Sequence, residues 1–185
     1  MPNANDTCHR PTQNAVVHSG KRVMTATSYP VLRPATPNDL VALCQLELDC
    51  FEGDRFSRRQ LTHLLTRANA VTWLAVAEGG ALRGYGTLLF RRNSRIARLY
   101  SFCVHPDARG GGLGRRLLET LEQEALERDM LKLSLEVRAD NRVAMGLYRR
   151  MGFLPRRWLD DYYIDGCAAW QMDKPLVVEP LCMAE

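Results

Sequence analysis

Hydrophobic residues recur along this chain at two spacings, and each spacing predicts one kind of secondary structure. Apolar positions three and four residues apart predict helices, whereas strict alternation of apolar and polar positions predicts strands. The first spacing occurs in four segments, so we expect four helices. Their expected inward-facing residues are, in chain order, Leu40, Leu43, Cys44 and Leu48; Leu61, Leu64 and Leu65; Leu113, Leu117, Leu118, Leu121 and Ala125; and Ala144, Leu147, Tyr148 and Met151.

Residues that favour helix ends stand beside three of these segments. Asn38 or Asp39 is placed to cap the first helix, and Ser57 is placed to cap the second. Asn141 is placed to cap the fourth, because a short polar side chain accepts hydrogen bonds from the free N–H groups of a first turn. Gly53 is expected to end the first helix.

Seven further segments carry strand-like patterns separated by turn residues. The expected strands are Val31-Leu32, Thr72 to Glu78, Tyr85 to Arg91, Ala97 to Val104, Leu131 to Val137, Leu154 to Tyr163 and Cys167 to Met172. The order is strand, two helices, three strands, helix, strand, helix and two strands. This order predicts an α/β fold with a mixed central sheet of about seven strands flanked by four helices.

The patterned region spans residues 29–176, which we interpret as one domain. The chain has 185 residues, of which 46% are hydrophobic, and this is enough for a single core of ordinary size. Residues 1–28 are polar without a period and predict a disordered N-terminal tail, in which Met24 is an alternative start. Residues 177–185 predict a short C-terminal tail.

Composition argues against several classes of partner. Lys and Arg number 25 against 21 Asp and Glu, and no arginine-rich stripe with interleaved aromatic residues occurs, so no nucleic-acid partner is expected. The densest basic cluster is interpreted as a solvated hairpin, and it contains Arg91, Arg92, Arg95 and Arg98. No apolar run approaches the length of a membrane span and no signal peptide is apparent, so no membrane association is expected.

Six cysteines and four histidines are scattered along the chain. They lack the spacing of a disulfide framework or of a metal site. We therefore expect a reducing cytoplasmic environment and no bound metal. Cys44 and Cys103 lie in apolar runs, where a free cysteine acts as a small hydrophobic residue.

A glycine-rich run separates the fourth expected strand from the third helix. Its residues are Arg109, Gly110, Gly111, Gly112, Leu113 and Gly114. Glycine lets the backbone adopt positive φ and approach a ligand closely, and the N–H groups at a helix start attract phosphate. The run lacks the Gly-Lys-Ser/Thr of a Walker loop and falls too late in the chain for a Rossmann loop. By itself it fits a phosphate cradle or a simple tight turn.

Two motifs together resemble the GNAT acyltransferases. The glycine-rich run matches the R-x-x-G-x-G/A element of that family, and Glu136 to Asn141, followed by Leu147-Tyr148 and Gly152-Phe153, looks like its second element. The resemblance covers about Val31 to Leu176, and the element order is also the GNAT order. It implies the GNAT fold and acetyl-CoA as co-substrate.

The resemblance also implies which residues hold acetyl-CoA. The main chain of Phe102, Cys103 and Val104 is expected to pair with its pantetheine arm, and the N–H groups of the glycine-rich run are expected to hold its pyrophosphate. Core packing is a compatible alternative for Phe102 and Cys103, because only main-chain atoms are needed. Asn141 is expected to bind the arm, to cap its helix, or both.

The segment from Leu135 to Phe153 is most similar to the RimI-like branch, the N-terminal alanine acetyltransferases of ribosomal proteins. Acetyl transfer to an amine needs a base for the ammonium and an acid for the departing thiolate. Glu136 matches the glutamate of that branch and is the candidate base, with an ion pair to a nearby arginine as its alternative role. Tyr148 is the candidate acid, with core packing as its alternative role.

The expected acceptor is a primary amine, first of all a peptide or protein N-terminus. One alternative is a small amine such as an amino acid or a polyamine, and another is a non-catalytic module that only binds acyl-CoA. Tyr162 and Tyr163 either line the acceptor cleft or merely pack. The carboxylates that would suit a cationic acceptor are Glu52, Asp54, Asp160 and Asp161. The chain is expected to be a monomer or a homodimer.

Overall fold

The computed structural model of this chain describes residues 29–51 and 55–176. The expected tails, the alternative start at Met24 and the expected helix end at Gly53 lie outside these residues. Within them, the helices and strands follow the expected order. The strands are β1 (Val31–Pro34), β2 (Ala70–Val76), β3 (Leu82–Phe90), β4 (Ile96–Val104), β5 (Lys132–Arg138), β6 (Leu154–Leu159) and β7 (Ala169–Pro175). The helices are α1 (Leu40–Cys50), α2 (Arg58–Thr66), α3 (Leu113–Glu127) and α4 (Arg142–Arg150), with short 3-10 turns at Pro37–Asp39 and Pro106–Ala108.

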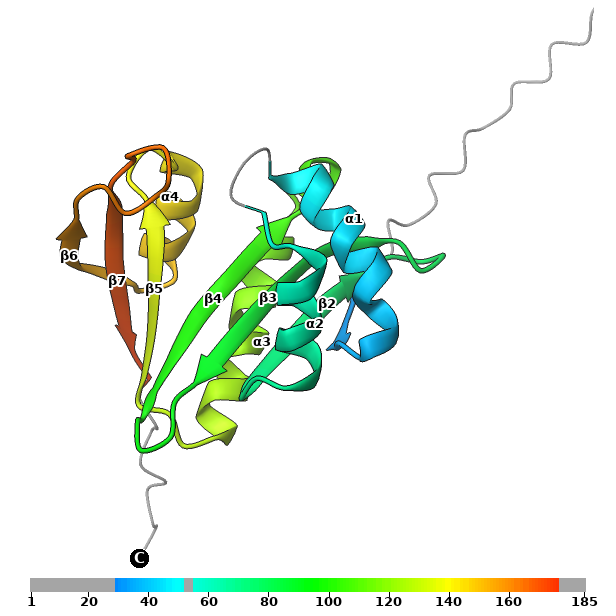
Figure 1. The fold of residues 1–185 in the computed structure, drawn as a ribbon, viewed down its shortest axis with the longest axis horizontal. Coiled ribbons are helices and arrows are strands. Elements are labelled where there is room, and N and C mark those ends of the chain that lie inside the picture. Colours follow the sequence, from blue (N-terminus) through cyan, green and yellow to red (C-terminus); the bar gives the residue numbers. More distant parts are fainter. Residues whose placement is uncertain (1–28, 52–54, 177–185) are drawn as a thin grey trace, which may run out of the picture.

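The strands form one seven-stranded sheet in the order β1-β2-β3-β4-β5-β7-β6. Strands β1 to β4 form an antiparallel meander, and β5, β7 and β6 form a second antiparallel group. Between the two groups β4 and β5 run parallel, because α3 carries the chain back across the sheet. Figure 1 shows the two groups as halves that meet along one end of β4 and β5. The expected α/β fold with a mixed sheet of seven strands and four helices is confirmed.

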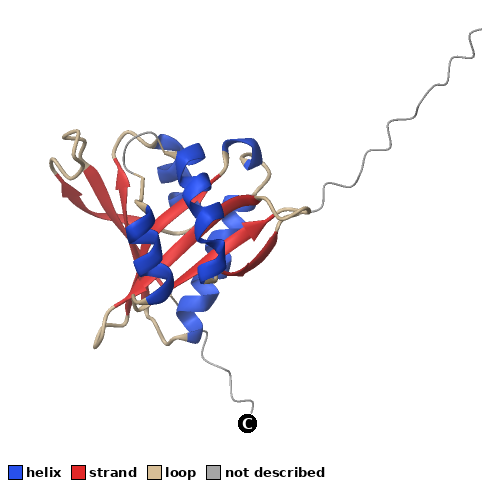
Figure 2. Cartoon of the chain, turned by 45° about the vertical axis from the view of Figure 1, so that its right-hand side comes forward, coloured by secondary structure: helices blue, strands red, loops and turns tan. Residues whose placement is uncertain are grey.

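The helices cover both faces of the sheet and enclose two cores (Figure 2). Helices α3 and α4 pack on one face, where the expected apolar stripe of α3 is buried as predicted. This larger core includes Leu99, Leu117, Leu121, Leu135, Tyr148 and Phe153. Helices α1 and α2 pack on the opposite face over a second core that includes Leu43, Leu46, Leu61, Leu74 and Tyr85. In the described stretches, no helix is both long and apolar enough to cross a membrane.

The helix caps are only partly as expected. Ser57 caps α2, because Gln60 N–H donates to Ser57 Oγ at 3.3 Å while Ser57 N–H donates to Gln60 Oε1 at 2.8 Å. Asp39 stands at the N-cap position of α1, but its side chain makes no capping bond there. Instead its carboxylate accepts from Thr36 N–H at 2.8 Å and from Arg33 at 2.6 Å. The guanidinium group outcompetes the free N–H groups of α1 for this carboxylate.

Leu48, which was expected to face inward, and Leu131, the first residue of an expected strand, are both exposed. Leu48 is 53% exposed, because α1 turns Leu46 and Glu47 toward the sheet instead. Apolar residues lie on several sides of this helix, so spacing alone does not select the buried stripe. Leu131 is 45% exposed, since β5 begins only at the next residue.

The strand boundaries differ from expectation where turns close early. Strand β2 ends before the expected Glu78, because a hydrogen bond from Ala77 N–H to Ala81 O already closes its turn. Strand β6 is also shorter than predicted, so Tyr162 and Tyr163 lie in the connection between β6 and β7. Asp161 has φ +46°, a left-handed conformation that ends an extended strand.

Candidate active site

The sheet divides between β4 and β5 partway along both strands. Their parallel pairing ends where Leu99 lies opposite Leu135. Beyond this point β4 continues to Val104, whereas β5 stays paired with β7 as far as Arg138. Figure 1 shows the two strands diverging from there. The outer half of β4 therefore presents an edge that no neighbouring strand covers.

A β-bulge at Tyr100 coincides with this division. On the other side of β4, Thr87 lies opposite Ser101 and Leu88 lies opposite Leu99, so Tyr100 is the extra residue. A bulge bends its strand and increases the local twist. The bulge therefore accounts for the direction in which the outer part of β4 leaves β5.

The backbone of β4 beyond the bulge has two kinds of residue. His105 N–H donates to Arg83 O at 2.9 Å, and bonded and non-bonded pairs alternate in an antiparallel ladder. Cys103 therefore directs its N–H and C=O toward β3, whereas Phe102 and Val104 direct theirs toward the open edge. The side chains of Phe102 and Cys103 pack in the larger and the second core respectively, so the packing alternative is present for both.

The glycine-rich run crosses from β4 to α3 as a loop with open space beside it. Gly110 has φ +83° and Gly112, the N-cap of α3, has φ +81°, a region that favours glycine. A Cβ on Gly110, Gly111 or Gly112 would meet no atom within 4 Å. No backbone N–H of residues 110–115 donates to another described residue. The loop therefore presents a row of free donors at the positive end of α3.

Arg109 closes the base of this loop and does not add a free backbone donor. Its N–H donates to Pro106 O at 3.2 Å, and its Nε donates to Val104 O at 3.0 Å. The Val104 carbonyl is thus already bonded within the protein. The donors available to a phosphate begin at Gly110.

Gly114, in the first turn of α3, lies where β4, α3 and α4 meet. A Cβ at Gly114 would lie 3.4 Å from Leu147 Cδ2 and 3.5 Å from Val104 Cγ2. The missing side chain lets α4 pack close to the end of β4. At the start of α4, Asn141 Oδ1 accepts from Ala144 N–H at 3.0 Å, so the expected cap is present.

Tyr148 reaches from α4 to the neighbourhood of β4. It is 6% exposed, and its ring centroid lies 6.2 Å from that of Phe102 and 5.6 Å from that of Phe153. Burial raises the pKa of the Tyr148 phenol well above its usual range, and Tyr163 and Cys103 raise it further. Its hydroxyl bonds to none of the described residues. A neutral phenol with a free hydroxyl is able to donate a proton.

Glu136 is the first residue of β5 beyond the last pair with β4, and it points away from the larger core. Arg98 Nε and Nη2 both lie 2.8 Å from the same oxygen, Oε2 of Glu136. The Glu136 side chain is 13% exposed. The ion pair expected as an alternative role is therefore present. Oε1 of Glu136 bonds to none of the described residues, so one carboxylate oxygen is left for a ligand.

The expectation that Arg98 belongs to a solvated hairpin is wrong. Arg91 and Arg92 are exposed beyond the end of β3, but Arg98 lies within β4 and is half-buried. Its guanidinium lies 5.3 Å from the Tyr100 ring centroid, and its Nη2 donates to the Tyr162 hydroxyl at 3.0 Å. Charge counting along the sequence does not detect this, because the partners come from other strands and loops.

A buried carboxylate on α1, Glu47, was not expected. Its two oxygens accept hydrogen bonds from the Tyr85 hydroxyl and from Phe56 N–H, each at 2.5 Å. The Tyr85 hydroxyl also lies 2.5 Å from Ser101 Oγ. Burial raises the pKa of the Glu47 carboxyl, although the two hydrogen bonds lower it. One sequence signal could have identified Glu47. It follows Leu43 by four residues, and this spacing places both residues on the inward face of the helix.

Aromatic side chains lie near Glu136 on this face of the sheet. The rings of Phe56, just before α2, and Tyr100 have centroids 5.2 Å apart. The rings of Tyr162 and Tyr163 pack edge to face at 5.2 Å, and the Tyr162 hydroxyl is bonded to Arg98. The β6–β7 connection is thereby held against the ion pair.

Of the carboxylates named for a cationic acceptor, the structure describes only Asp160 and Asp161. Glu52 and Asp54 lie outside the described residues. Asp160 accepts a hydrogen bond from Trp158 Nε1 at 2.6 Å, and neither it nor Asp161 contacts Arg98. Over residues 29–51 and 55–176, no three His, Cys, Asp or Glu side chains are grouped so that they could hold a metal ion.

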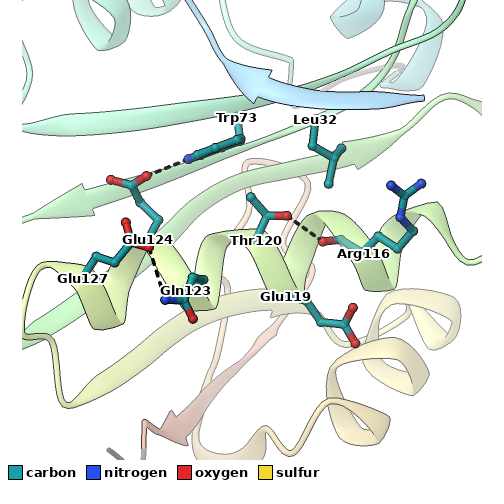
Figure 3. A pocket seen from close by; sticks show the side chains of 8 residues that line it. All are labelled: Leu32, Trp73, Arg116, Glu119, Thr120, Gln123, Glu124 and Glu127. Atoms are coloured by element: carbon teal, nitrogen blue, oxygen red, sulfur yellow. Dashed lines mark hydrogen bonds between the residues drawn. The ribbon is translucent and has the colours of Figure 1, made fainter. Parts of the chain in front are cut away.

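A hollow of about 450 Å³ lies between α3 and the strands β1 and β2 (Figure 3). Its lining residues are Leu32, Trp73, Arg116, Glu119, Thr120, Gln123, Glu124 and Glu127. Trp73 Nε1 donates to Glu124 Oε2 at 2.9 Å across one end of it. None of these residues belongs to β4, β5 or α4, so the hollow is separate from the candidate active site.

Both the sequence and the fold match known proteins. Residues 40–153 match the model of the Acetyltransferase (GNAT) family. The chain is 31% identical over 149 residues to an IAA acetyltransferase of Azospirillum brasilense, across 79% of this chain and 97% of the relative. It is 28% identical over 128 residues to a putative ribosomal protein bS18-alanine N-acetyltransferase of Bacillus subtilis, across 69% of this chain and 82% of the relative. Its fold is similar to that of the ribosomal-protein-S18-alanine N-acetyltransferase from Escherichia coli, with a TM-score of 0.72 and 25% sequence identity. The match covers 84% of this chain and 99% of that protein.

The resemblance carried by the two motifs is thus confirmed, including its relation to the RimI-like branch. The matched family model begins with α1 and ends just after α4, so it includes the glycine-rich run, the divided strands and Glu136. This chain belongs to the GNAT family of acetyltransferases and is an acyltransferase that uses acetyl-CoA.

Proposed function

We propose that this enzyme acetylates the N-terminal amine of a peptide or protein, with Glu136 as base and Tyr148 as acid. The observation that carries the proposal is the position of Glu136, at the point where β4 and β5 part, with one oxygen that no described residue uses. An ammonium placed there meets a carboxylate beside the edge of β4. Similarity to two ribosomal-protein alanine acetyltransferases supports the choice of acceptor.

The open edge and the glycine loop are suited to hold acetyl-CoA. The free backbone groups of Phe102 and the N–H of Val104 would bind its extended arm, as an added strand does. The N–H groups of residues 110–115 would hold its pyrophosphate. Asn141 would contact the arm through the part of its side chain that the cap leaves unused. Acetyl-CoA supplies the activated acyl group as a thioester.

The proton steps fall to two side chains on opposite faces of the sheet. Glu136 Oε1 would take a proton from the acceptor ammonium, directly or through a water, and so produce the nucleophilic amine. Tyr148 would donate its hydroxyl proton to the departing sulfur. Its pKa, raised by burial, keeps the phenol protonated at neutral pH.

An open surface beside Glu136 favours a peptide acceptor. Helices α1 and α2 pack on β2 and β3, and Figure 1 shows no helix in front of β5, β7 and β6 on that side. A peptide that places its N-terminus at Glu136 would continue across these strands. A small amine is the second candidate, favoured by the similarity to an aminoglycoside N(6')-acetyltransferase of Stenotrophomonas maltophilia, 28% identical over 133 residues.

A panel of acceptors tests the proposal. Release of the CoA thiol is followed with peptides that begin with alanine or other residues, with the same peptides blocked at the N-terminus, and with amino acids and polyamines. We expect turnover of free but not blocked peptides, and loss of about 100-fold or more in Glu136→Gln. Turnover of amino acids or polyamines but of no peptide would mean that the acceptor is a small amine and not a peptide N-terminus. Full activity of Glu136→Gln would remove Glu136 from the base role.

A further inference from the structure

Arg98 connects three segments around the point where the sheet divides. It lies on β4, its guanidinium is bonded to Glu136 on β5, and its Nη2 donates to the Tyr162 hydroxyl in the β6–β7 connection. The Tyr100 ring of the bulge lies 5.3 Å from its guanidinium carbon. The proton steps described above assign no role to this arginine.

The contact with Glu136 is asymmetric in a way that matters for a base. Arg98 Nε donates a hydrogen bond to Oε2 at 2.8 Å and the cationic Nη2 lies 2.8 Å from the same oxygen, whereas Oε1 has no hydrogen bond to any described residue. A guanidinium is a rigid planar group, so a hydrogen bond from Nε and the close charge of Nη2 on the same oxygen restrict rotation of the carboxylate. Oε1 is thereby held in one orientation while it stays unbonded.

The surroundings keep this pair together. The Glu136 side chain is 13% exposed and that of Arg98 is 32% exposed. Burial lowers the pKa of Arg98, but the charge and hydrogen bond of Glu136, together with Tyr162 and Tyr100, raise it overall. A partly buried ion pair of this kind resists separation, because each charge alone would lack its partner. Tyr162 and Tyr100 hold the guanidinium from its other sides.

We propose that Arg98 is a positioning residue for acetyl transfer, which fixes Glu136 through Oε2 so that Oε1 faces the acceptor amine. This inference rests on the proposed role of Glu136 as base. If it is right, Arg98 acts only through Glu136. Its removal then lowers kcat because the carboxylate samples other rotamers, and it leaves acetyl-CoA binding nearly unchanged.

A double-mutant cycle distinguishes this role from a general structural one. Arg98→Met, Glu136→Gln and the double variant are compared on the amine that the acceptor panel turns over fastest. We expect Arg98→Met to lower kcat by about 10- to 100-fold in the wild-type background, and by no more than about twofold in the Glu136→Gln background. The KM for acetyl-CoA is expected to stay within about twofold in all variants.

The conservative substitution supplies a second readout. In Arg98→Lys an ammonium can donate to Oε2 but lacks the planar fork, so we expect an intermediate kcat. If Arg98→Met fails to fold, the cycle is completed with Arg98→Lys. Equal losses in both backgrounds, or Arg98→Lys as impaired as Arg98→Met, would overturn the positioning role.

Arg128 provides a matched control on α3. Its Nε donates to Glu124 at 2.7 Å and its guanidinium carbon lies 4.7 Å from the Phe90 ring, so it repeats the chemistry of Arg98 away from the divided strands. We expect Arg128→Met to leave kcat unchanged. A loss equal to that of Arg98→Met would mean that any such pair supports the fold, and it would overturn the proposal. Full activity of Glu136→Gln would instead count against the proposed base itself.

Discussion

The Glu47 carboxylate on α1 accepts a hydrogen bond from the Tyr85 hydroxyl on β3 at 2.5 Å, within the core between that helix and the sheet. The same carboxylate accepts from Phe56 N–H, and Tyr85 continues the chain of contacts to Ser101 on β4. These bonds place Phe56 beside Tyr100. A single buried carboxylate thus links the bulged strand to the segment that approaches the candidate acceptor side.

Stability should depend on pH through Glu47. Burial raises the pKa of this carboxyl in the folded state, so the folded protein binds the proton more tightly than the unfolded chain. The resulting stabilisation is complete at pH values below the pKa of this carboxyl in the unfolded chain. It is lost as pH rises through the pKa of the carboxyl in the folded protein. Glu47→Gln does not titrate. We therefore expect the melting temperature of the wild type to fall relative to Glu47→Gln as pH rises from about 4 to 7, measured by thermal unfolding.

Glu119→Gln is the control for this comparison, because Glu119 lies on the exposed surface of α3 in an ion pair with Arg115. Its difference from the wild type is expected to change little over the same pH range. A constant difference between wild type and Glu47→Gln would contradict the assignment.

Tyr148→Phe should separate catalysis from binding. The hydroxyl bonds to none of the described residues, so its removal leaves the ring packing and the melting temperature nearly unchanged. We expect kcat to fall by about 10- to 100-fold if the phenol protonates the leaving thiolate. The KM for acetyl-CoA should stay close to that of the wild type. Steady-state kinetics check this, and unchanged turnover would exclude Tyr148 as the acid.

Gly112→Ala should weaken acetyl-CoA binding and stability together. Gly112 has φ +81°, where an L-residue costs about 1–2 kcal/mol, and relief of that strain would move the N–H groups of the loop. We expect the KM for acetyl-CoA to rise by about tenfold, which corresponds to about 1.4 kcal/mol. Gly79→Ala, at φ +91° in the β2–β3 turn, is the matched control. It should lower the melting temperature similarly without changing that KM, and equal KM changes in both would argue against the loop as the cradle.

Phe56→Ala should affect the acceptor and not the cofactor. The Phe56 ring lies 5.2 Å from that of Tyr100 on the proposed acceptor side. An aromatic contact with the acceptor would be worth about 0.5–1.5 kcal/mol, so its loss should raise the acceptor KM by about two- to twelvefold. The Phe56 N–H bond to Glu47 involves the backbone and persists in the variant. Kinetics with acceptor and acetyl-CoA varied in turn check this. A selective rise in the KM for acetyl-CoA would place Phe56 on the other side of the reaction.

Local patterns predicted much of this molecule. The stripe of α3 is spaced so that one face must be apolar, and it is buried as expected. Ser57 and Gln60 are three residues apart and form the cap that their spacing allows. The glycine-rich run occurs where a strand turns into a helix, and the positive φ of Gly110 and Gly112 follows from that turn. In each case the partners lie within a few residues along the chain.

The predictions were wrong where the local sequence pattern was compatible with more than one buried face or strand end. Helix α1 has apolar residues on more than one side, so the choice between Leu48 and the face containing Leu46 and Glu47 depended on what the sheet offered. Tyr85 presents a hydroxyl to this helix, and the Glu47 carboxylate accepts a hydrogen bond from it, which a leucine side chain cannot do. The final hairpin likewise had enough strand-forming residues to extend further, but Asp161 ends it early.

The sequence by itself determined the order of elements, the family, the glycine loop, and the identity of Glu136 and Tyr148 as candidates, because these depend on spacing within single segments. Only the tertiary structure decided that β4 and β5 part after Leu99 and that Arg98 holds Glu136 by one oxygen. The Arg98–Glu136 and Glu47–Tyr85 contacts each join residues 38 positions apart. Such contacts follow from the pairing of strands and the packing of a helix on a sheet, which no local pattern of hydrophobic and polar residues specifies.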